Sequence, residues 1–193
     1  MKERISRMLE NRITEDTRRI VGKVVRRMNG KEAKILDLGC GDRGSFDYFD
    51  ADIISADRSR DVLARVEGRK KVLADCDKKL PFKKEQFDMV VFSGVMQYLQ
   101  KPEASVREIW RIIKKRGTLI LTTVNRDSSL RRIGAIKKEP KRSAGEHKIF
   151  SRRQIVGLLP ENGFKVKKVL GADFMWMPKN LSSNLIFVAV KDC

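Results

Sequence analysis

The sequence predicts an α/β protein built on a doubly wound, seven-stranded, mostly parallel sheet, preceded by an amphipathic helical segment. Short apolar runs alternate along the chain with segments whose apolar residues recur at helical spacing. The first five runs are apolar on both faces, which is typical of strands inside a parallel sheet. The first run leads directly into a glycine-rich turn, and such sheets bind ligands beyond the carboxyl ends of their central strands.

The helical segment is expected at residues 4–29. Its apolar positions, from Ile5 to Met28, follow helical spacing, and the pair Asn29-Gly30 supplies a left-handed stop. The opposite face of this helix is basic. We expect five buried parallel strands after it, which are Lys34–Leu38, Asp52–Ala56, Lys71–Ala74, Phe87–Phe92 and Thr118–Val124.

A helix over Pro102–Arg116, with a core-facing apolar stripe and Gly117 as its terminator, connects the last two of these strands. The spacing of Ser151 and Gln154 is that of a capping box and predicts the start of another helix, which ends near Pro160. The last two strands, of which the final one is antiparallel, are expected at Phe164–Leu170 and Leu185–Lys191.

The composition excludes several classes of protein. The longest apolar run, Leu185–Val190, is far below the roughly 20 residues of a membrane span, and Met1 begins a charged segment rather than a signal peptide. We therefore expect a cytoplasmic protein without a membrane span. The three cysteines, Cys40, Cys76 and Cys193, have no metal-type spacing, so reduced thiols are expected and no metal site.

The chain carries a formal net charge of +18, and the excess is concentrated in two segments. Residues 1–34 hold eleven Lys or Arg against five Asp or Glu, and residues 126–153 hold ten against three. Solvated helix faces and a nucleic-acid or other polyanionic partner both explain such an excess. Aromatic residues for base stacking are scarce, with two Tyr and two Trp, so the charge alone does not decide between these explanations.

The segment that carries chemistry runs from Ile35 to Gly44. In it, an apolar strand enters a turn with Gly39, Gly41 and Gly44, where glycine lets a ligand approach the backbone and permits positive φ. The glycine spacing is also compatible with a dinucleotide site. However, Asp37 stands two residues before the first glycine, where a carboxylate would repel a pyrophosphate but favour a cationic sulfonium ligand.

This motif, Leu36-Asp-Leu-Gly-Cys-Gly41, resembles the first motif of class I S-adenosylmethionine-dependent methyltransferases, specifically the methyltransferase type 11 family. The resemblance is strong over about residues 33–125 and looser over 145–190. It implies a Rossmann-like methyltransferase fold and S-adenosyl-L-methionine as cofactor. It also implies one domain over 1–193, with a helical segment (1–30), a cofactor-binding core (31–125) and a substrate-side part holding a loop, a helix and the last two strands (126–193).

The resemblance further implies which residues contact the cofactor. Asp57, followed by Arg58, matches the acidic residue that ends the second strand and binds both ribose hydroxyls, for which a carboxylate is suited. Asp75 and Cys76 match the motif after the third strand, whose Asp contacts the adenine amino group. The complete set of expected cofactor-binding residues is Asp37, Gly39, Cys40, Gly41, Gly44, Asp57, Arg58, Asp75, Cys76, Ser93, Gly94 and Val95.

The sequence departs from the family pattern at several points, among them the third glycine, which falls one position later than usual, and Pro160, which interrupts a helix. Only seven residues, Ser45 to Ala51, separate Gly44 from the second strand, so the first helix must be very short and the methionine end of the cofactor is expected to be held differently. Gln97 and Tyr98 stand where many relatives carry an acidic residue followed by His, which removes a common polar contact near the cofactor.

The reaction itself is expected to need alignment more than acid–base chemistry, because the sulfonium methyl is already activated. His147, the single histidine, is a candidate general base beyond the fifth strand, although a structural role in packing the tail is sufficient to explain it. Cys40 and Cys76 are expected to fill space rather than act as nucleophiles. Trp176 and its apolar neighbours either line an acceptor pocket or pack in the core or in a dimer.

The function expected is therefore methyl transfer to a small-molecule acceptor, with RNA as the alternative acceptor because of the two basic segments. A non-catalytic cofactor-binding scaffold and an NAD-dependent oxidoreductase are the lesser alternatives. The acceptor atom, the oligomeric state and the pathway are not determined by the sequence.

Overall fold

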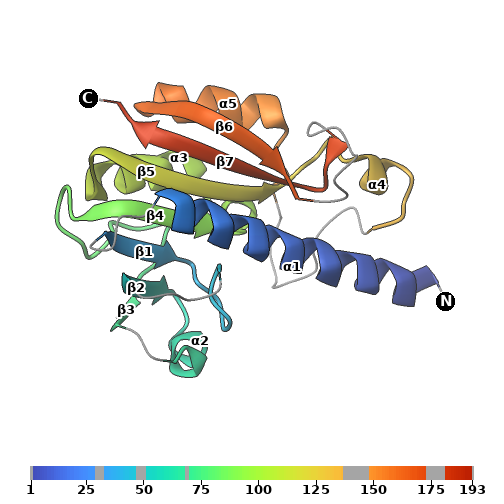
Figure 1. The fold of residues 1–193 in the computed structure, drawn as a ribbon, viewed down its shortest axis with the longest axis horizontal. Coiled ribbons are helices and arrows are strands. Elements are labelled where there is room, and N and C mark those ends of the chain that lie inside the picture. Colours follow the sequence, from blue (N-terminus) through green and yellow to red (C-terminus); the bar gives the residue numbers. More distant parts are fainter. Residues whose placement is uncertain are drawn as a thin grey trace.

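The computed structural model describes residues 2–28, 33–46, 51–67, 70–136, 148–172 and 181–192. These residues contain one seven-stranded sheet with the order β3-β2-β1-β4-β5-β7-β6. The first five strands in the sequence pair in parallel, and β7 is antiparallel to both β5 and β6. The chain winds outward in both directions from β1 and β4, so the predicted doubly wound α/β fold is confirmed (Figure 1).

The predicted strands agree with the observed ones to within one residue at almost every end. The strands are β1 (Lys34–Leu38), β2 (Asp52–Asp57), β3 (Lys70–Leu73), β4 (Phe87–Ser93), β5 (Ile113–Val124), β6 (Phe164–Gly171) and β7 (Asn184–Lys191). The helices are α1 (Lys2–Met28), α2 (Arg60–Arg65), the 3-10 helix η1 (Met96–Tyr98), α3 (Pro102–Ile112), α4 (Ser129–Arg132) and α5 (Arg152–Glu161). The capping box of Ser151 and Gln154 at the start of α5 is also confirmed.

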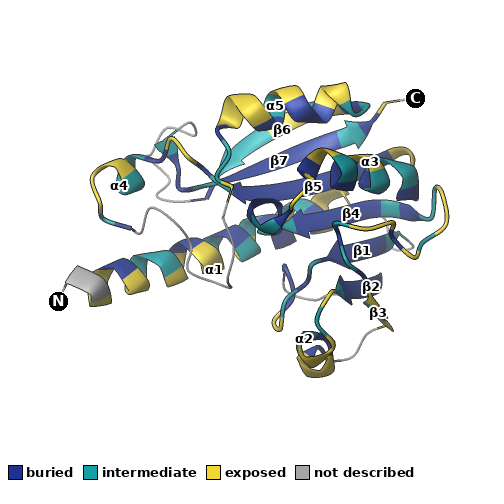
Figure 2. Ribbon diagram, turned by 180° about the vertical axis from the view of Figure 1, so that it is seen from behind, coloured by how far each residue is buried: buried dark blue, intermediate teal, exposed yellow. Residues whose placement is uncertain are grey.

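Helices cover both faces of the sheet and form two apolar cores. On one face, Val21 and Val25 of α1 pack against Ile35 of β1 and the apolar side chains beside it. On the other face, α3 and α5 contribute the residues of the larger core, among them Ile109 and Ile155. Figures 1 and 2, which view the molecule from opposite sides, show α1 on one face and α3 with α5 on the other.

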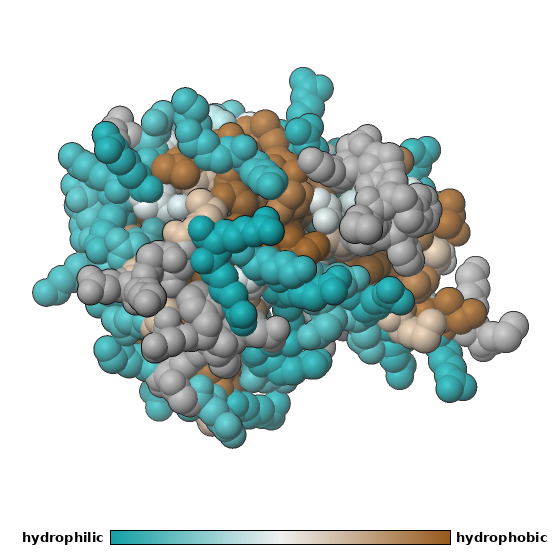
Figure 3. All heavy atoms as spheres, in the orientation of Figure 1, coloured by the Kyte–Doolittle hydropathy of each residue, from teal (hydrophilic) through white to brown (hydrophobic). Residues whose placement is uncertain are grey.

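The predicted N-terminal helix is confirmed as α1, but its N-terminal half extends past the sheet, so its apolar stripe is not buried along the whole length. Ile5 is 48% exposed and Met8 is 65% exposed, whereas Val21 and Val25 are fully buried. The reason is that only the second half of the helix lies over the strands (Figure 1). Figure 3 shows apolar atoms at this projecting end of the molecule, surrounded by hydrophilic ones.

Helix α3 is shorter than predicted, because it ends at Ile112 rather than at Arg116. The amide groups of Glu85 and Gln86 donate to the carbonyl oxygens of Arg111 and Ile112, at 3.0 and 2.8 Å. A helix end needs such donors for its last carbonyl groups, and here a neighbouring turn supplies them. The chain therefore leaves the helix one turn early and enters β5.

Two further sequence interpretations need correction. Gly117 does not stop a helix, because it lies within β5, and a Cβ there would come within 2.9 Å of the Asp88 carbonyl oxygen. Glycine is therefore needed for close backbone approach. Strand β3 is not a buried strand, since it forms one edge of the sheet, where Leu73 is 46% exposed.

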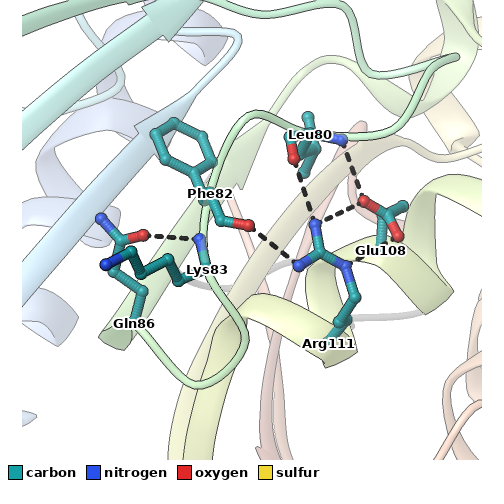
Figure 4. Close-up of polar contacts among 6 residues, drawn as sticks. All are labelled: Leu80, Phe82, Lys83, Gln86, Glu108 and Arg111. Atoms are coloured by element: carbon teal, nitrogen blue, oxygen red, sulfur yellow. Dashed lines mark hydrogen bonds and ion pairs between the residues drawn. The ribbon is translucent and has the colours of Figure 1, made fainter.

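Hydrogen bonds from the guanidinium group of Arg111 help to attach the segment after β3 to α3. Arg111 donates to the carbonyl oxygens of Leu80 and Phe82, at 3.1 and 2.9 Å, and forms a bidentate pair with Glu108 (Figure 4). Glu108 in turn accepts a hydrogen bond of 2.9 Å from the amide of Leu80. The hydrogen bond from Arg111 is the main reason that the pKa of Glu108 lies below its usual value of 4.5.

None of the helices in the described ranges combines the length and the hydrophobicity that a membrane crossing requires.

We predict that Arg111→Ala lowers the free energy of unfolding by about 2 kcal/mol, because it removes the guanidinium donor from two carbonyl groups and leaves the Glu108 carboxylate with the Leu80 amide alone. The exposed Arg107 of the same helix supplies the control, and its replacement by alanine should change stability by less than about 0.5 kcal/mol. Denaturant unfolding measures both variants, and equal effects of the two would contradict the assigned role.

The contribution of the Arg111–Glu108 pair to stability should depend on pH. A carboxyl group whose pKa is lowered by folding stabilises the protein at pH values above its ordinary pKa, which is 4.5 for Glu108. This stabilisation is lost as the pH falls through the lowered pKa of the folded state. The difference in stability between the wild type and Arg111→Ala should therefore shrink in acid. A difference that stays constant down to pH 3 would show that Glu108 does not contribute.

Candidate functional site

A cavity of about 750 Å³ lies at the carboxyl ends of the central strands. It is lined by the residues that follow β1, β2, β3 and β4, by the end of β5, and by parts of α1 and α4. Strands β1 and β4 are adjacent in the sheet, and the chain order reverses between them, which is where doubly wound sheets bind ligands. Figure 1 shows the N-terminal half of α1 and the short α4 beyond these strand ends.

The glycine-rich turn after β1 forms the floor of this cavity. Gly39, Gly41 and Gly44 all have positive φ, at 71°, 63° and 72°, a conformation that L side chains rarely adopt. A Cβ on Gly39 would collide with the side chain of Val95. A Cβ on Gly41 would meet no atom within 4 Å, so the backbone of this residue faces open space in the cavity.

Asp37 holds this turn from below rather than facing the cavity. Its carboxylate is fully buried and accepts a hydrogen bond of 3.0 Å from the amide of Ser45. Asp37 is absent from the residues that line the cavity, unlike the glycines that follow it. A direct contact of Asp37 with a ligand therefore stays a prediction, whereas its contact with the turn explains why an acidic residue is useful at this position.

Asp57, at the end of β2, is oriented by two backbone amides. One carboxylate oxygen accepts a hydrogen bond of 3.1 Å from Gly41, and the other accepts one of 3.0 Å from Ser59. Each carboxylate oxygen has about two acceptor sites, so Asp57 can still accept hydrogen bonds from a diol. The side chain lines the cavity together with the neighbouring Arg58.

The segment after β3 adds Asp75, Cys76 and Asp77 to the wall. The carboxylate of Asp75 accepts a hydrogen bond of 3.1 Å from the amide of Asp77, which makes a turn at the cavity edge. Burial, with a smaller effect of the carboxylates of Asp75, Asp57 and Asp77, raises the pKa of Cys76 to about 12. The thiol stays protonated at neutral pH, in agreement with the expectation that Cys76 is not a nucleophile.

Ser93, Gly94 and Val95, which follow β4, line the opposite wall. Thr122 of β5 positions two of them, because its hydroxyl lies 2.9 Å from the Ser93 hydroxyl and accepts a hydrogen bond of 3.0 Å from the Gly94 amide. The next cavity residue along the chain is Gln97, which is 4% exposed. Its Oε1 atom has no hydrogen-bond partner among the described residues, so a ligand donor can satisfy it.

The structure adds residues that the sequence interpretation missed. Part of α1, including Thr14 and Arg18, and part of α4, including Arg131, also line the cavity. Asp77 also lines it, and its carboxylate accepts hydrogen bonds from the amides of Gln100 and Lys101. The helical pattern of α1 predicts a helix but not which part of the sheet it crosses, so no sequence signal identifies these residues.

The predicted site residues thus come together, with two exceptions. All the expected cofactor-binding residues line the cavity except Asp37, which lies beneath the turn. His147 lies outside the described residues, as do Trp176 and its apolar neighbours, so their proposed roles stay predictions. The described residues contain no group of three His, Cys, Asp or Glu that could hold a metal ion.

The two glycines that flank Cys40 should respond differently to alanine. Gly39→Ala is expected to lower the stability of the protein, because its Cβ collides with Val95. Gly41→Ala should cost only about 1–2 kcal/mol for its positive φ but should weaken ligand binding, because its Cβ enters the cavity. Thermal unfolding and calorimetric titration with S-adenosylhomocysteine separate the two effects. Gly41→Ala with unchanged affinity would mean that no ligand approaches this backbone.

Comparison with known proteins agrees with this geometry. A family model described as a methyltransferase domain matches residues 36–121, which run from β1 into β5. A solved structure of a SAM-dependent methyltransferase from Thermotoga maritima superposes on 96% of this chain and 93% of its own, with a TM-score of 0.73 at 19% identity. The Rossmann-like methyltransferase fold is therefore confirmed.

Curated relatives extend the comparison. Two uncharacterized proteins of Methanocaldococcus jannaschii are 29% and 31% identical to this chain over 113 and 139 residues. The chain spans little more than half of their lengths, 55% and 57%. The ubiquinone biosynthesis O-methyltransferase of Glaesserella parasuis is 24% identical over 182 residues, which cover 80% of this chain and 77% of that protein. These matches confirm the resemblance to class I methyltransferases that the motifs indicate.

Proposed function

We propose that this chain, whose residues 36–121 match a methyltransferase domain of the class I fold, transfers the methyl group of S-adenosylmethionine to a small-molecule acceptor. The observation that carries the proposal is the position of Asp57. Its carboxylate lines the cavity at the end of β2 and is held by the amide of the glycine turn, beside the backbone of Gly41 that faces open space.

The residues around the cavity fit S-adenosylmethionine. Asp57 can accept hydrogen bonds from both hydroxyls of a ribose, since a carboxylate accepts several charge-assisted bonds. Asp75, at the next strand end, can accept a hydrogen bond from the adenine amino group. The open space above Gly41 allows close approach of the cofactor to the turn, and a volume of about 750 Å³ is in the range of pockets that enclose ligands of this size.

The residues of this chain act by alignment. When bound, S-adenosylmethionine supplies a methyl group that is already activated for in-line displacement. Asp57 and Asp75 fix the nucleoside, and Ser93 to Val95 form the wall beside it. Alignment of a nucleophile with a reactive atom contributes several kcal/mol to catalysis. An acceptor that is already deprotonated requires no acid or base from the described residues.

Residues of α1 and α4 line the cavity beside the strand ends, and we place the acceptor on this side. The cavity volume of about 750 Å³ is in the range of small-molecule sites, which favours a small-molecule acceptor. Gln97 supports a polar acceptor, because its buried Oε1 can accept a hydrogen bond from a hydroxyl or an N–H group. The curated relative from Glaesserella parasuis, a ubiquinone biosynthesis O-methyltransferase, is consistent with this class of acceptor.

Asp57→Ala should weaken the binding of S-adenosylhomocysteine by about 2–3 kcal/mol, the loss expected when hydrogen bonds to a charged group are removed. Asp52, which begins the same strand far from the cavity and is exposed, supplies the matched control in Asp52→Ala. Isothermal titration calorimetry measures both, with thermal unfolding to confirm that each variant is folded. Equal affinity of Asp57→Ala and the wild type would refute the ribose assignment.

The acceptor class can be tested directly. After incubation of the protein and a cell extract with methyl-labelled S-adenosylmethionine, the label should enter the small-molecule fraction and not the RNA or protein fractions. Filter binding of RNA should show a shallow salt dependence, since the proposed site tracks no row of phosphates. Label in the RNA fraction, together with a steep salt dependence, would replace the small-molecule proposal with the RNA alternative.

A further inference from the structure

Gln97 is a buried glutamine whose side-chain oxygen has no protein partner at the cavity. The residue is 4% exposed, it lines the cavity, and its Oε1 atom has no hydrogen-bond partner among the described residues. Polar neighbours on the same wall are paired, since the hydroxyl groups of Ser93 and Thr122 lie 2.9 Å apart. A buried acceptor without a donor costs free energy, so folding alone does not explain a glutamine at this position.

Hydrogen bonds of the surrounding backbone fix the position of Gln97. It is the middle residue of η1, in which the amide of Tyr98 donates to the carbonyl oxygen of Val95 at 2.9 Å. The carbonyl oxygen of Gln97 accepts a hydrogen bond of 3.0 Å from the amide of Lys148. Its Nε2 atom lies 3.9 Å from the position that a Cβ on Gly94 would take, so the amide group packs beside the turn after β4.

The strand order separates Gln97 from the nucleoside. Asp75 and Asp57, which the proposed function assigns to the nucleoside, follow β3 and β2, and both strands lie on one side of β1. Gln97 follows β4, on the other side of β1. The part of the cavity beside Gln97 is therefore available to an acceptor when the nucleoside is bound.

We propose that Gln97 selects the methyl acceptor, and that it requires an uncharged hydroxyl or N–H donor beside the atom that is methylated. The inference deepens the proposed function and rests on it, because it assumes that the cavity holds S-adenosylmethionine and a small molecule. An acceptor with this donor pairs with the Gln97 oxygen, whereas one without it leaves the oxygen buried and unpaired. The donor is uncharged because an amide oxygen supplies no counter-charge and the sulfonium of the cofactor repels a nearby cation.

The test uses Gln97→Met, which keeps the length of the side chain and removes its polar atoms. Without ligands, the variant should raise the melting temperature by about 2–4 °C, because it removes an unpaired buried oxygen. The affinity for S-adenosylhomocysteine in calorimetric titration should stay within about twofold of the wild type. The transfer of label from methyl-labelled S-adenosylmethionine into the small-molecule fraction of a cell extract should fall at least about tenfold.

Two other glutamines supply matched controls. Gln100→Met should leave the melting temperature, the affinity and the transfer of label unchanged, because Gln100 is exposed and does not line the cavity. Gln86→Met should lower the melting temperature, because the Oε1 atom of Gln86 accepts a hydrogen bond of 2.8 Å from the amide of Lys83. The change in melting temperature therefore has opposite signs for a paired and an unpaired glutamine.

Chemical capping of the extract tests the donor on the acceptor. Treatment with acetic anhydride esterifies hydroxyl groups and acylates amines. After removal of the excess reagent, the wild type should transfer far less label into the capped small-molecule fraction than into the untreated one. Undiminished transfer would overturn the proposal.

The variant gives further outcomes that decide the matter. The proposal is overturned if Gln97→Met lowers the melting temperature, because the side chain would then be structural. It is also overturned if the variant transfers label as the wild type does, or if it loses affinity for S-adenosylhomocysteine together with transfer. A wild type that binds S-adenosylhomocysteine but labels no small molecule would refute the proposed function instead, so the two failures are distinguishable.

Discussion

The close approach of Gly39 to Val95 is the constraint on which the rest of the site depends. This contact joins the ends of β1 and β4, the adjacent strands from which the sheet winds in opposite directions. Only a residue without a Cβ permits it, and the positive φ of the turn then directs the next residues along the cavity floor. Asp37 from below and Asp57 from the side hold the turn in this shape through its amide groups.

The parts of the fold that depend on local pattern could be predicted from the sequence. Apolar runs give the strands, and Ser151 with Gln154 gives the start of α5, because capping is decided within one turn of chain. The end of α3 could not be predicted, since the turn at Glu85 and Gln86, far away in the sequence, supplies the hydrogen bonds that end it. The exposure of β3 likewise depends on its place in the strand order and not on its composition.

The same distinction applies to the site. Residues at strand ends, such as Asp57 and Asp75, are predictable because parallel strands bring their carboxyl ends to one edge of the sheet. The role of Thr122 depends on the register between β4 and β5, in which it lies opposite Ser93. Arg18 is on a helix whose periodicity reports only which side faces the sheet, and its position beside the glycine turn follows from how α1 crosses the molecule.

Helix α1 both packs on the sheet and lines the cavity. Its second half packs Val21 and Val25 against the sheet, and the preceding turns form a wall of the cavity. Thr17 lies at the junction, where its hydroxyl accepts a hydrogen bond of 3.1 Å from Asn184 of β7. Binding of a ligand in the cavity and packing of α1 on the sheet are therefore thermodynamically linked. A ligand that contacts α1 also opposes local detachment of the helix from the sheet, and weaker packing beneath the helix lowers the affinity for the ligand.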